Sequence, residues 1–329
     1  MSAQIYPLVM QPVYKDHVWG GDRIIRMYGR DEPPGTYAES WEVSDRDDGM
    51  STIANGAWRG RPLREVVEAW GSRLLGEAPR SASGHFPLLI KLIDSRERLS
   101  LQVHPDDETS ARYGGEAKTE MWCILEADPG AKVFAGLRQG VDAAAFQEAV
   151  AGQGIEEIVV PVPVAKGDAV FTPGGCVHAI DAGCLILEVQ QNSNTTYRIH
   201  DWGRVGADGE PRALHLEEAL RVIRWDDTAE AKIKPSQRET DGTNELWEVL
   251  RCPYFRTERL EVREPWACPM NGKTFHVLFV SEGSVGLHWE GGEEETLVAG
   301  SSCLVPADLG GYRLDPLHRD TVAWRVSHP

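Results

Sequence analysis

The strictly alternating stretch from residue 99 to residue 104 is the feature that most constrains the fold of this chain. Its apolar positions are Leu99, Leu101 and Val103, and its polar positions are Ser100, Gln102 and His104. Because successive side chains of a β-strand point to opposite faces, the three polar residues share one face. Pro105 cannot donate a hydrogen bond to a strand ladder and should end the strand. The stretch therefore predicts a strand with a buried apolar face and a polar face that can bind a ligand.

A second polar pair follows in the extended run 118–120, where Lys118 and Glu120 share a face. A single His, Gln or Glu on a strand is usually only hydrogen-bonded or solvated. A glutamine, a histidine, a carboxylate and an ammonium that face one interior are more than packing requires. We therefore predict a metal site beside a charged substrate group.

A glycine-rich motif downstream supports this interpretation. Gly167, Pro173, Gly175 and His178 have the spacing of a motif that resembles the second motif of the cupin superfamily, in which a glycine-rich turn presents a metal-binding histidine from a β-barrel wall. The first cupin motif is matched less well. Residues 102–104 read Gln-Val-His instead of His-x-His, and Glu120 follows His104 by sixteen residues instead of three or four.

Four segments of the chain, in this order, resemble the type I phosphomannose isomerases in their short bacterial form. The atypical first cupin motif points to the same family. The segments are LSLQVHPDD, KTEMW, GGCVHAI and QQNSNTTYRIHDWGR, and FPLLIKLID, WGG at 19–21 and TYAESWEVS at 36–44 are similar to that family as well. The resemblance spans roughly residues 14–225. It implies a mainly β fold of two cupin-type barrels (double-stranded β-helix or jelly roll) with a few peripheral helices. It also implies an aldose-ketose isomerase that interconverts mannose 6-phosphate and fructose 6-phosphate through a cis-enediol(ate).

The expected metal ligands are two imidazoles, one carboxylate and one amide oxygen. Two histidines and a carboxylate with open positions suit zinc, but also iron(II) or manganese. The resemblance implies one Zn²⁺ per chain, held by Gln102, His104, Glu120 and His178.

The expected catalytic residues are Arg198, Glu188, Lys118 and Lys91. Lys91 interrupts an apolar run, so it either guards a strand edge or faces a polar cavity, and the resemblance favours the cavity. Arg198, on a face with Thr196 and His200, is the family's active-site arginine and can stabilise enediolate charge. The general base stays open among Glu188, Lys118, Lys91, His200 and metal-bound water.

The net charge of −17 argues against nucleic acid and anionic membranes as partners. A phosphosugar substrate then requires concentrated positive charge in the pocket, and the expected substrate-binding residues are Ser100, Lys91, Lys118 and Arg198. No apolar run approaches the ~20 residues of a membrane span, and the amino terminus lacks secretory features. Six scattered cysteines are typical of reduced, buried thiols. We expect a cytoplasmic monomer or homodimer.

The predicted domains are a catalytic metal-binding cupin domain at 1–235 and a smaller cupin-like domain without a metal site at 236–329, joined by a polar linker at 232–245. Residues 167–178 overlay residues 300–311 at a constant offset of 133, which places Gly311 on His178. Helices are predicted at 62–76, 106–113, 142–151 and 215–224, and short strands at 155–164, 168–172, 176–181, 184–190 and 195–201.

Two other functions use a similar set of residues. An iron(II) cupin oxygenase would need the same two histidines and carboxylate, but not Gln102 or a positively charged pocket. A metal-stabilised sugar-binding protein without turnover would have to hold Arg198 and two lysines around one cavity with no anion to pair them. Metal analysis combined with an isomerase assay separates the three functions.

Overall fold

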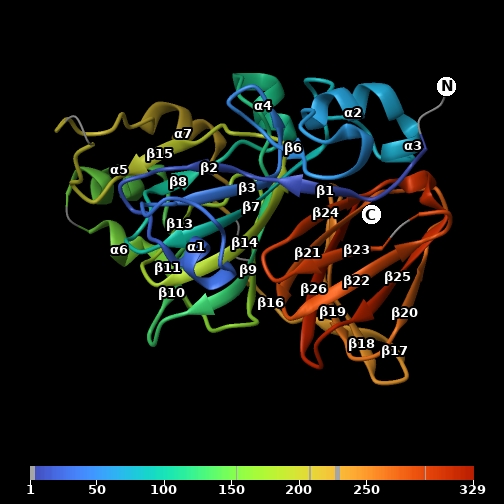
Figure 1. The fold of residues 1–329 in the computed structure, drawn as a ribbon. Helices are drawn as coiled ribbons and strands as arrows, with labels where there is room; N and C mark the ends of the chain where they lie inside the picture. The colour runs from blue at the N-terminus through green and yellow to red at the C-terminus, as the bar shows by residue number, and fades with distance from the viewer. Residues whose placement is uncertain (1–3, 153, 207–208, 227–229, 293) are drawn as a thin grey trace. The chain divides into compact units, whose positions relative to one another are not determined.

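The computed structural model describes residues 4–152, 154–206, 209–226, 230–292 and 294–329, and it is mainly β (Figure 1). The chain forms two compact units that are not contiguous in sequence. One unit contains residues 14–40 and 90–233, and the other contains residues 1–13, 41–89 and 234–329. The domains predicted from the sequence, 1–235 and 236–329, are in contrast each one continuous segment. The difference arises because β1 (Leu8–Gln11) pairs with β24 (Ser302–Val305), so amino-terminal segments complete a sheet of the carboxy-terminal unit.

Two antiparallel sheets build the unit that contains the alternating stretch. The seven-stranded sheet has the order β16 (Lys232–Ile233), β12 (Ala169–Thr172), β9 (Glu120–Ala127), β14 (Cys184–Gln191), β7 (Leu88–Ser95), β3 (Glu39–Val43) and β2 (Val13–Lys15). The five-stranded sheet has the order β11 (Val159–Pro163), β10 (Lys132–Leu137), β13 (His178–Ile180), β8 (Leu101–Val103) and β15 (Tyr197–His200).

The other unit is also built from antiparallel sheets. Its eight-stranded sheet has the order β17 (Ser236–Asp241), β18 (Asn244–Arg251), β19 (Arg256–Val262), β26 (Thr321–Ser327), β21 (His276–Glu282), β24, β1 and β6 (Thr52–Ile53). Its four-stranded sheet has the order β20 (Trp266–Pro269), β25 (Gly311–Pro316), β22 (Ser284–Trp289) and β23 (Glu295–Val298). A small hairpin joins β4 (Asp45–Arg46) to β5 (Gly49–Met50).

The helices are short. They are α1 (Arg23–Tyr28), α2 (Leu63–Trp70), α3 (Ser72–Leu75), α4 (Asp107–Tyr113), α5 (Ala143–Ala151), α6 (Ile155–Ile158) and α7 (Leu216–Val222), with 3₁₀ turns at Gly56–Trp58 and Ala307–Leu309. In α5 the Asp142 side chain accepts a hydrogen bond from the Ala145 N–H, as its predicted N-cap role requires. No helix among the described residues is long and apolar enough to span a membrane.

Three elements differ in part from their sequence-based predictions. The helix predicted at 62–76 is two helices, because Gly71 adopts a left-handed φ of 51° that ends α2. The strand predicted at 155–164 begins with helix α6, and only its second half is β11. The predicted linker 232–245 does contain the boundary between the two units, at 233/234, but most of it forms strands. They include β17, whose exposed side chains on a sheet edge give a polar sequence.

The alternation predicted at 99–104 holds within strand β8, whereas Leu99 precedes the strand and packs in another apolar cluster, with Trp122 and Ile180. Leu101 and Val103 lie in an apolar cluster with residues of α5 and α7, including Phe146 and Val222. Gln102 therefore points to the opposite face, and its backbone pairs with His178 on β13. The packing of one face thus fixes which side chains reach the site.

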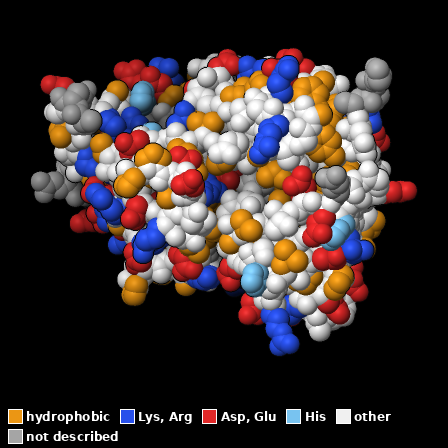
Figure 2. Space-filling view, viewed as in Figure 1, with side chains coloured by type: hydrophobic (Ala, Val, Ile, Leu, Met, Phe, Trp, Pro, Cys, Tyr) orange, Lys and Arg blue, Asp and Glu red, His pale blue; other side chains and the backbone are white. Residues whose placement is uncertain are grey.

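The overlay at an offset of 133 agrees with the strand positions. Strand β12 spans 169–172 and β24 spans 302–305, while His178 and Gly311 are the first residues of β13 and β25. These matching positions agree with the predicted repeat, in which Gly311 takes the position of His178. Acidic and basic side chains are interspersed over the visible face of the molecule (Figure 2).

The half-buried imidazole of His276 is expected to make the stability of the second unit pH-dependent. Its Nδ1 lies 3.0 Å from the Tyr312 hydroxyl, and burial, together with Arg325 and Arg256, lowers the pKa of His276 to about 3. The native state then binds fewer protons than the unfolded state below a pH of about 6.5. We expect the free energy of unfolding to fall as pH decreases from about 6.5 towards 3, by up to about 1.4 kcal/mol per pH unit.

Urea unfolding of the wild type and of His276→Gln between about pH 7 and pH 5 tests this expectation. The variant should lose part of the pH dependence, whereas His318→Gln, which changes an exposed histidine, should keep it. Identical pH slopes in the wild type and His276→Gln would contradict the assignment.

Candidate metal centre and active site

A row of paired residues across the five-stranded sheet builds one wall of the site. His178 on β13 is the backbone partner of Gln102 on β8, and Gln102 is in turn the partner of Arg198 on β15. Residues directly opposite one another in antiparallel strands project to the same face. The sheet therefore presents an imidazole, an amide and a guanidinium side by side.

The seven-stranded sheet contributes the carboxylate. Glu120 begins β9 and is fully buried. Its Oε1 lies 3.2 Å from His178 Nε2, and its Oε2 lies 3.6 Å from His104 Nε2. One ligand atom from each of these three residues lies within 4.8 Å of the other two. The structure thus brings together three of the four predicted ligands, which are far apart in the sequence.

Both imidazoles are oriented by backbone carbonyls. Nδ1 of His104 donates to the carbonyl oxygen of Thr195 at 2.8 Å, and Nδ1 of His178 donates to that of Cys176 at 2.9 Å. Each Nε2 therefore keeps its lone pair and points to Glu120. Burial, with Lys118 nearby, lowers the pKa of both rings, which keeps them neutral as metal binding requires.

This donor set fits a divalent transition metal. Burial opposes ionisation of Glu120, but Lys118 and His178 hold its pKa below the usual value, so the carboxylate is charged. Two neutral imidazole nitrogens and one carboxylate are the ligands that zinc, iron(II) and manganese accept. Gln102 belongs to the same group of side chains. Its amide nitrogen Nε2 lies 3.3 Å from His178 Nε2.

Lys118 lies at the edge of this cluster. Its Nζ is 2.7 Å from Glu120 Oε2 and 3.0 Å from His104 Nε2. Ser100 is buried, and its hydroxyl donates to Gln102 Oε1 at 3.5 Å. Both residues therefore adjoin the ligand set, as the sequence pattern indicates.

A second ionic group lies on the seven-stranded sheet around Lys91. Its Nζ is 3.0 Å from Glu188 Oε1 and 3.5 Å from Glu39 Oε1. The Nε1–H of Trp122 donates to Glu188 Oε2 at 2.9 Å. Lys91 is buried, but Glu188 and Glu39 raise its pKa against the effect of burial, so it stays charged. Burial and the charge of Glu120 raise the pKa of Glu188, although Lys91 opposes the shift.

Sequence reasoning did not identify Glu39 and Trp122 as parts of this group. Glu39 lies in the strand-like run ESWEVS, which gave the only available signal, a carboxylate within an otherwise buried strand. The sequence indicates that Trp122 is a core residue, and its side chain is buried. Its indole N–H also donates to Glu188 on the neighbouring strand β14. Such partnerships depend on strand order and register, which the sequence pattern does not contain.

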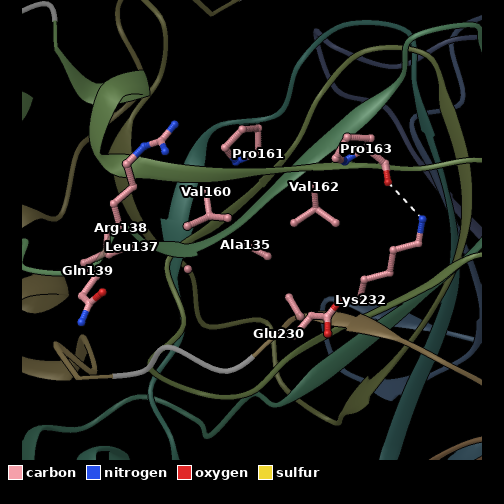
Figure 3. Close-up of a pocket in the computed structure, with 12 residues that line it drawn as sticks. Ala135, Leu137, Arg138, Gln139, Val160, Pro161, Val162, Pro163, Glu230 and Lys232 are labelled. Carbon is pink, nitrogen blue, oxygen red and sulfur yellow. Dashed lines mark hydrogen bonds between the residues drawn. The ribbon is translucent and has the colours of Figure 1, made fainter.

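A pocket of about 770 Å³ lies elsewhere in the same unit, along β10 and β11. Figure 3 shows Val160 and Val162 pointing from β11 towards Glu230 and Lys232, whose Nζ donates to the Pro163 carbonyl at 3.2 Å. Its lining contains none of the predicted site residues. We therefore assign the candidate active site to the buried cluster and not to this pocket.

The chain is similar to proteins of one family. The profile of the type I phosphomannose isomerase catalytic domain matches residues 8–128. The mannose-6-phosphate isomerase of Streptococcus mutans is 34% identical over 257 residues, which covers 78% of this chain and 79% of that protein. A probable mannose-6-phosphate isomerase of Bacillus subtilis, GmuF, is 30% identical over 328 residues, covering 98% and 99%. A crystal structure of the Bacillus subtilis mannose 6-phosphate isomerase superimposes with a TM-score of 0.89 at 28% identity, covering 98% of this chain and 99% of that chain.

Proposed function

The chain belongs to the type I phosphomannose isomerases, an enzyme family with a cupin fold, and we propose that it is a zinc-dependent isomerase of mannose 6-phosphate and fructose 6-phosphate. The observation that carries this proposal is the buried cluster of His104, Glu120 and His178. The cluster supports a metal centre because both imidazoles are oriented by carbonyls and neutral. Gln102 is proposed as the fourth ligand.

The proposed reaction opens the sugar ring and moves a proton between C1 and C2 through a cis-enediol(ate). When bound, the metal supplies Lewis acidity to the sugar oxygens. The protein must then move the proton and balance charge. Of the candidate residues, Lys91 is unsuited as a base because its carboxylate partners keep it protonated. We assign it the role of holding Glu188 and adding positive charge for the anionic substrate.

Glu188 is the better candidate for the proton transfer. A carboxyl whose pKa is raised by burial and by Glu120 exchanges protons more readily near neutral pH. The Trp122 indole and Lys91 fix the two oxygens of this carboxylate, so its orientation is preset. Lys118 is the alternative proton carrier, because its ammonium adjoins both Glu120 and His104. Ser100 is proposed to contact a substrate hydroxyl or phosphate oxygen.

Metal analysis and a coupled assay test the function together. The purified protein should contain about one zinc per chain and form fructose 6-phosphate from mannose 6-phosphate. We expect prolonged chelation to lower activity at least ~100-fold and added zinc to restore it. Because the proposed ligand set contains no cysteine, the chelated protein should keep its far-UV circular dichroism spectrum. Full activity without metal would contradict the proposal, and iron with oxygen uptake would identify an oxygenase instead.

A further inference from the structure

A pocket of about 610 Å³ lies within the second unit, to which all of its lining residues belong. Its lining includes three cationic side chains, Arg251, Arg256 and Lys273, and the acidic side chain of Glu77. The chain as a whole has a net charge of −17, so this local excess of positive charge differs from the average. Small-molecule sites commonly enclose about 300–1,000 Å³. The pocket therefore has the size of a site for a small ligand.

The strand pairing relates one residue of this pocket to the candidate metal centre. Glu120 begins β9 and pairs with Thr172 on β12. His276 begins β21 and pairs with Val305 on β24. Positions 172 and 305 are separated by the same offset of 133 as the overlaid motifs. In the predicted repeat His276 therefore takes the position of Glu120, and it lines the pocket.

A buried ion pair next to His276 has the reverse polarity of the pair in the other unit. On β26, Arg325 takes the position that Glu188 has on β14, since each lies opposite the third residue of its neighbour, β21 or β9. Nε of Arg325 donates to Glu258 Oε2 at 2.7 Å, whereas Glu188 contacts Lys91. A guanidinium thus stands where the other unit has a carboxylate, which disfavours a metal cation and favours an anion.

Alternating charges connect this ion pair to the pocket. Nε of Arg251 and Nε of Arg256 lie 3.6 Å and 2.8 Å from Glu248 Oε2. Nη2 of Arg256 lies 2.6 Å from Glu258 Oε1, which links it to Arg325 on the other oxygen. The side chains of both glutamates are largely buried. Three cations therefore share two carboxylates, and the series carries a net positive charge.

Two further donors at the pocket are available to a ligand. The described residues give the Lys273 ammonium no ion pair or hydrogen bond. Nδ1 of His276 lies 3.0 Å from the Tyr312 hydroxyl, while its Nε2 has no hydrogen-bond partner among the described residues. The backbone of this wall is fixed, because the Glu77 N–H donates to the Lys273 carbonyl at 2.7 Å. The donors are therefore held in place before any ligand arrives.

We propose that this pocket binds a phosphate group, either free or carried by a small sugar. The inference does not rest on the proposed isomerase function, because it uses none of the residues assigned to that function. A phosphate dianion balances the net positive charge, accepts from Lys273 and His276, and matches the planar donors of guanidinium groups. Asn271 and Ser327, which also line the pocket, offer neutral polar groups to sugar hydroxyls.

The imidazole resonances in two-dimensional NMR spectra of the zinc-loaded protein report on this pocket. The His276 resonance is assigned as the one missing in His276→Gln. We expect it to shift and saturate on addition of inorganic phosphate or glucose 6-phosphate. Lys273→Gln should raise the dissociation constant read from this shift ~10–100-fold, the effect of losing a hydrogen bond between charged groups. Lys234→Gln is the matched control, since it removes one positive charge from an exposed position of the same unit outside the pocket.

Each outcome decides between the proposal and an empty pocket. Tighter binding of glucose 6-phosphate than of phosphate supports a site for a sugar phosphate, and equal affinities support a site for the phosphate group alone. A His276 resonance that does not move at millimolar phosphate, or unchanged affinity in Lys273→Gln, overturns the site. If Lys273→Gln does not fold, Arg251→Gln at a second exposed position of the lining decides in the same way. The kcat and KM for mannose 6-phosphate, measured in parallel, test the proposed function separately.

Discussion

His178→Ala is expected to abolish metal retention and to lower isomerase activity at least ~100-fold. The imidazole is buried, its Nδ1 is tied to the Cys176 carbonyl, and its Nε2 lies 3.2 Å from Glu120. Alanine removes one of about four ligands, and changes in the immediate surroundings of a metal alone weaken binding ~10–100-fold. The variant should therefore lose zinc on dialysis. Elemental analysis of the dialysed protein, together with the coupled assay, measures both effects.

The repeat in the second unit provides the matched control. His288 lies on β22, its Nε2 lies 2.9 Å from Asp315 Oδ2, and in the predicted repeat Gly311 takes the position of His178. His288→Ala should therefore leave the zinc content and activity unchanged. Full zinc occupancy in His178→Ala would refute the assigned centre. A stoichiometry of two tightly bound metals per chain would refute the view that the second unit has no metal site.

Lys91→Met is expected to destabilise the protein by about 3–5 kcal/mol, the usual range when one partner of a buried ion pair is removed. The lysine neutralises Glu188 at 3.0 Å and Glu39 at 3.5 Å. All three side chains are buried, so water cannot replace the lost partner. Methionine keeps most of the volume, and the loss therefore reports on charge and not on packing. Urea unfolding at about pH 7 measures the change in the free energy of unfolding.

The double variant Lys91→Met/Glu188→Gln identifies the cause of this destabilisation. Glutamine removes one of the two negative charges that lose their contact with Lys91, and it keeps an acceptor for the Trp122 indole N–H. The double variant should therefore be more stable than Lys91→Met by at least about 1 kcal/mol, a coupling typical of residues in contact. If the effects of Lys91→Met and Glu188→Gln on the free energy of unfolding simply add in the double variant, the expectation is refuted. Lys91 would then not stabilise the protein by compensating the charge of Glu188.

Local sequence patterns were sufficient to predict where several residues of the candidate site lie on their strands. The alternation at 99–104 predicted the face of Gln102, and the glycine-rich turn predicted the place of His178. Patterns of this kind depend only on the period of the strand and on turn chemistry, which neighbouring residues determine. The same reasoning correctly placed helix α5, because Asp142 is an N-cap irrespective of what the helix packs against.

Other features depended on contacts between distant segments. The sequence at 232–245 is polar enough to resemble a linker, but the edge of the eight-stranded sheet accommodates it as β17. The helix at 62–76 has one apolar face, but Gly71 interrupts it where the chain turns. Composition predicts neither outcome. A polar segment can form a strand only when the fold brings another strand beside it for hydrogen bonding.

The sequence by itself determined the kinds of chemical group in the site and the faces on which they lie. Only the tertiary structure decided which groups meet. Strand order places Glu120 between His104 and His178, register places Trp122 opposite Glu188, and the return of the chain at 212–213 brings Arg212 and the Ala213 carbonyl to Arg198 and Asp201. Side-chain periodicity is a local property of the backbone, whereas pairing between strands depends on the packing of the whole unit. The residues of the candidate metal cluster could therefore be predicted from motifs, and the partners of Lys91 and Arg198 could not.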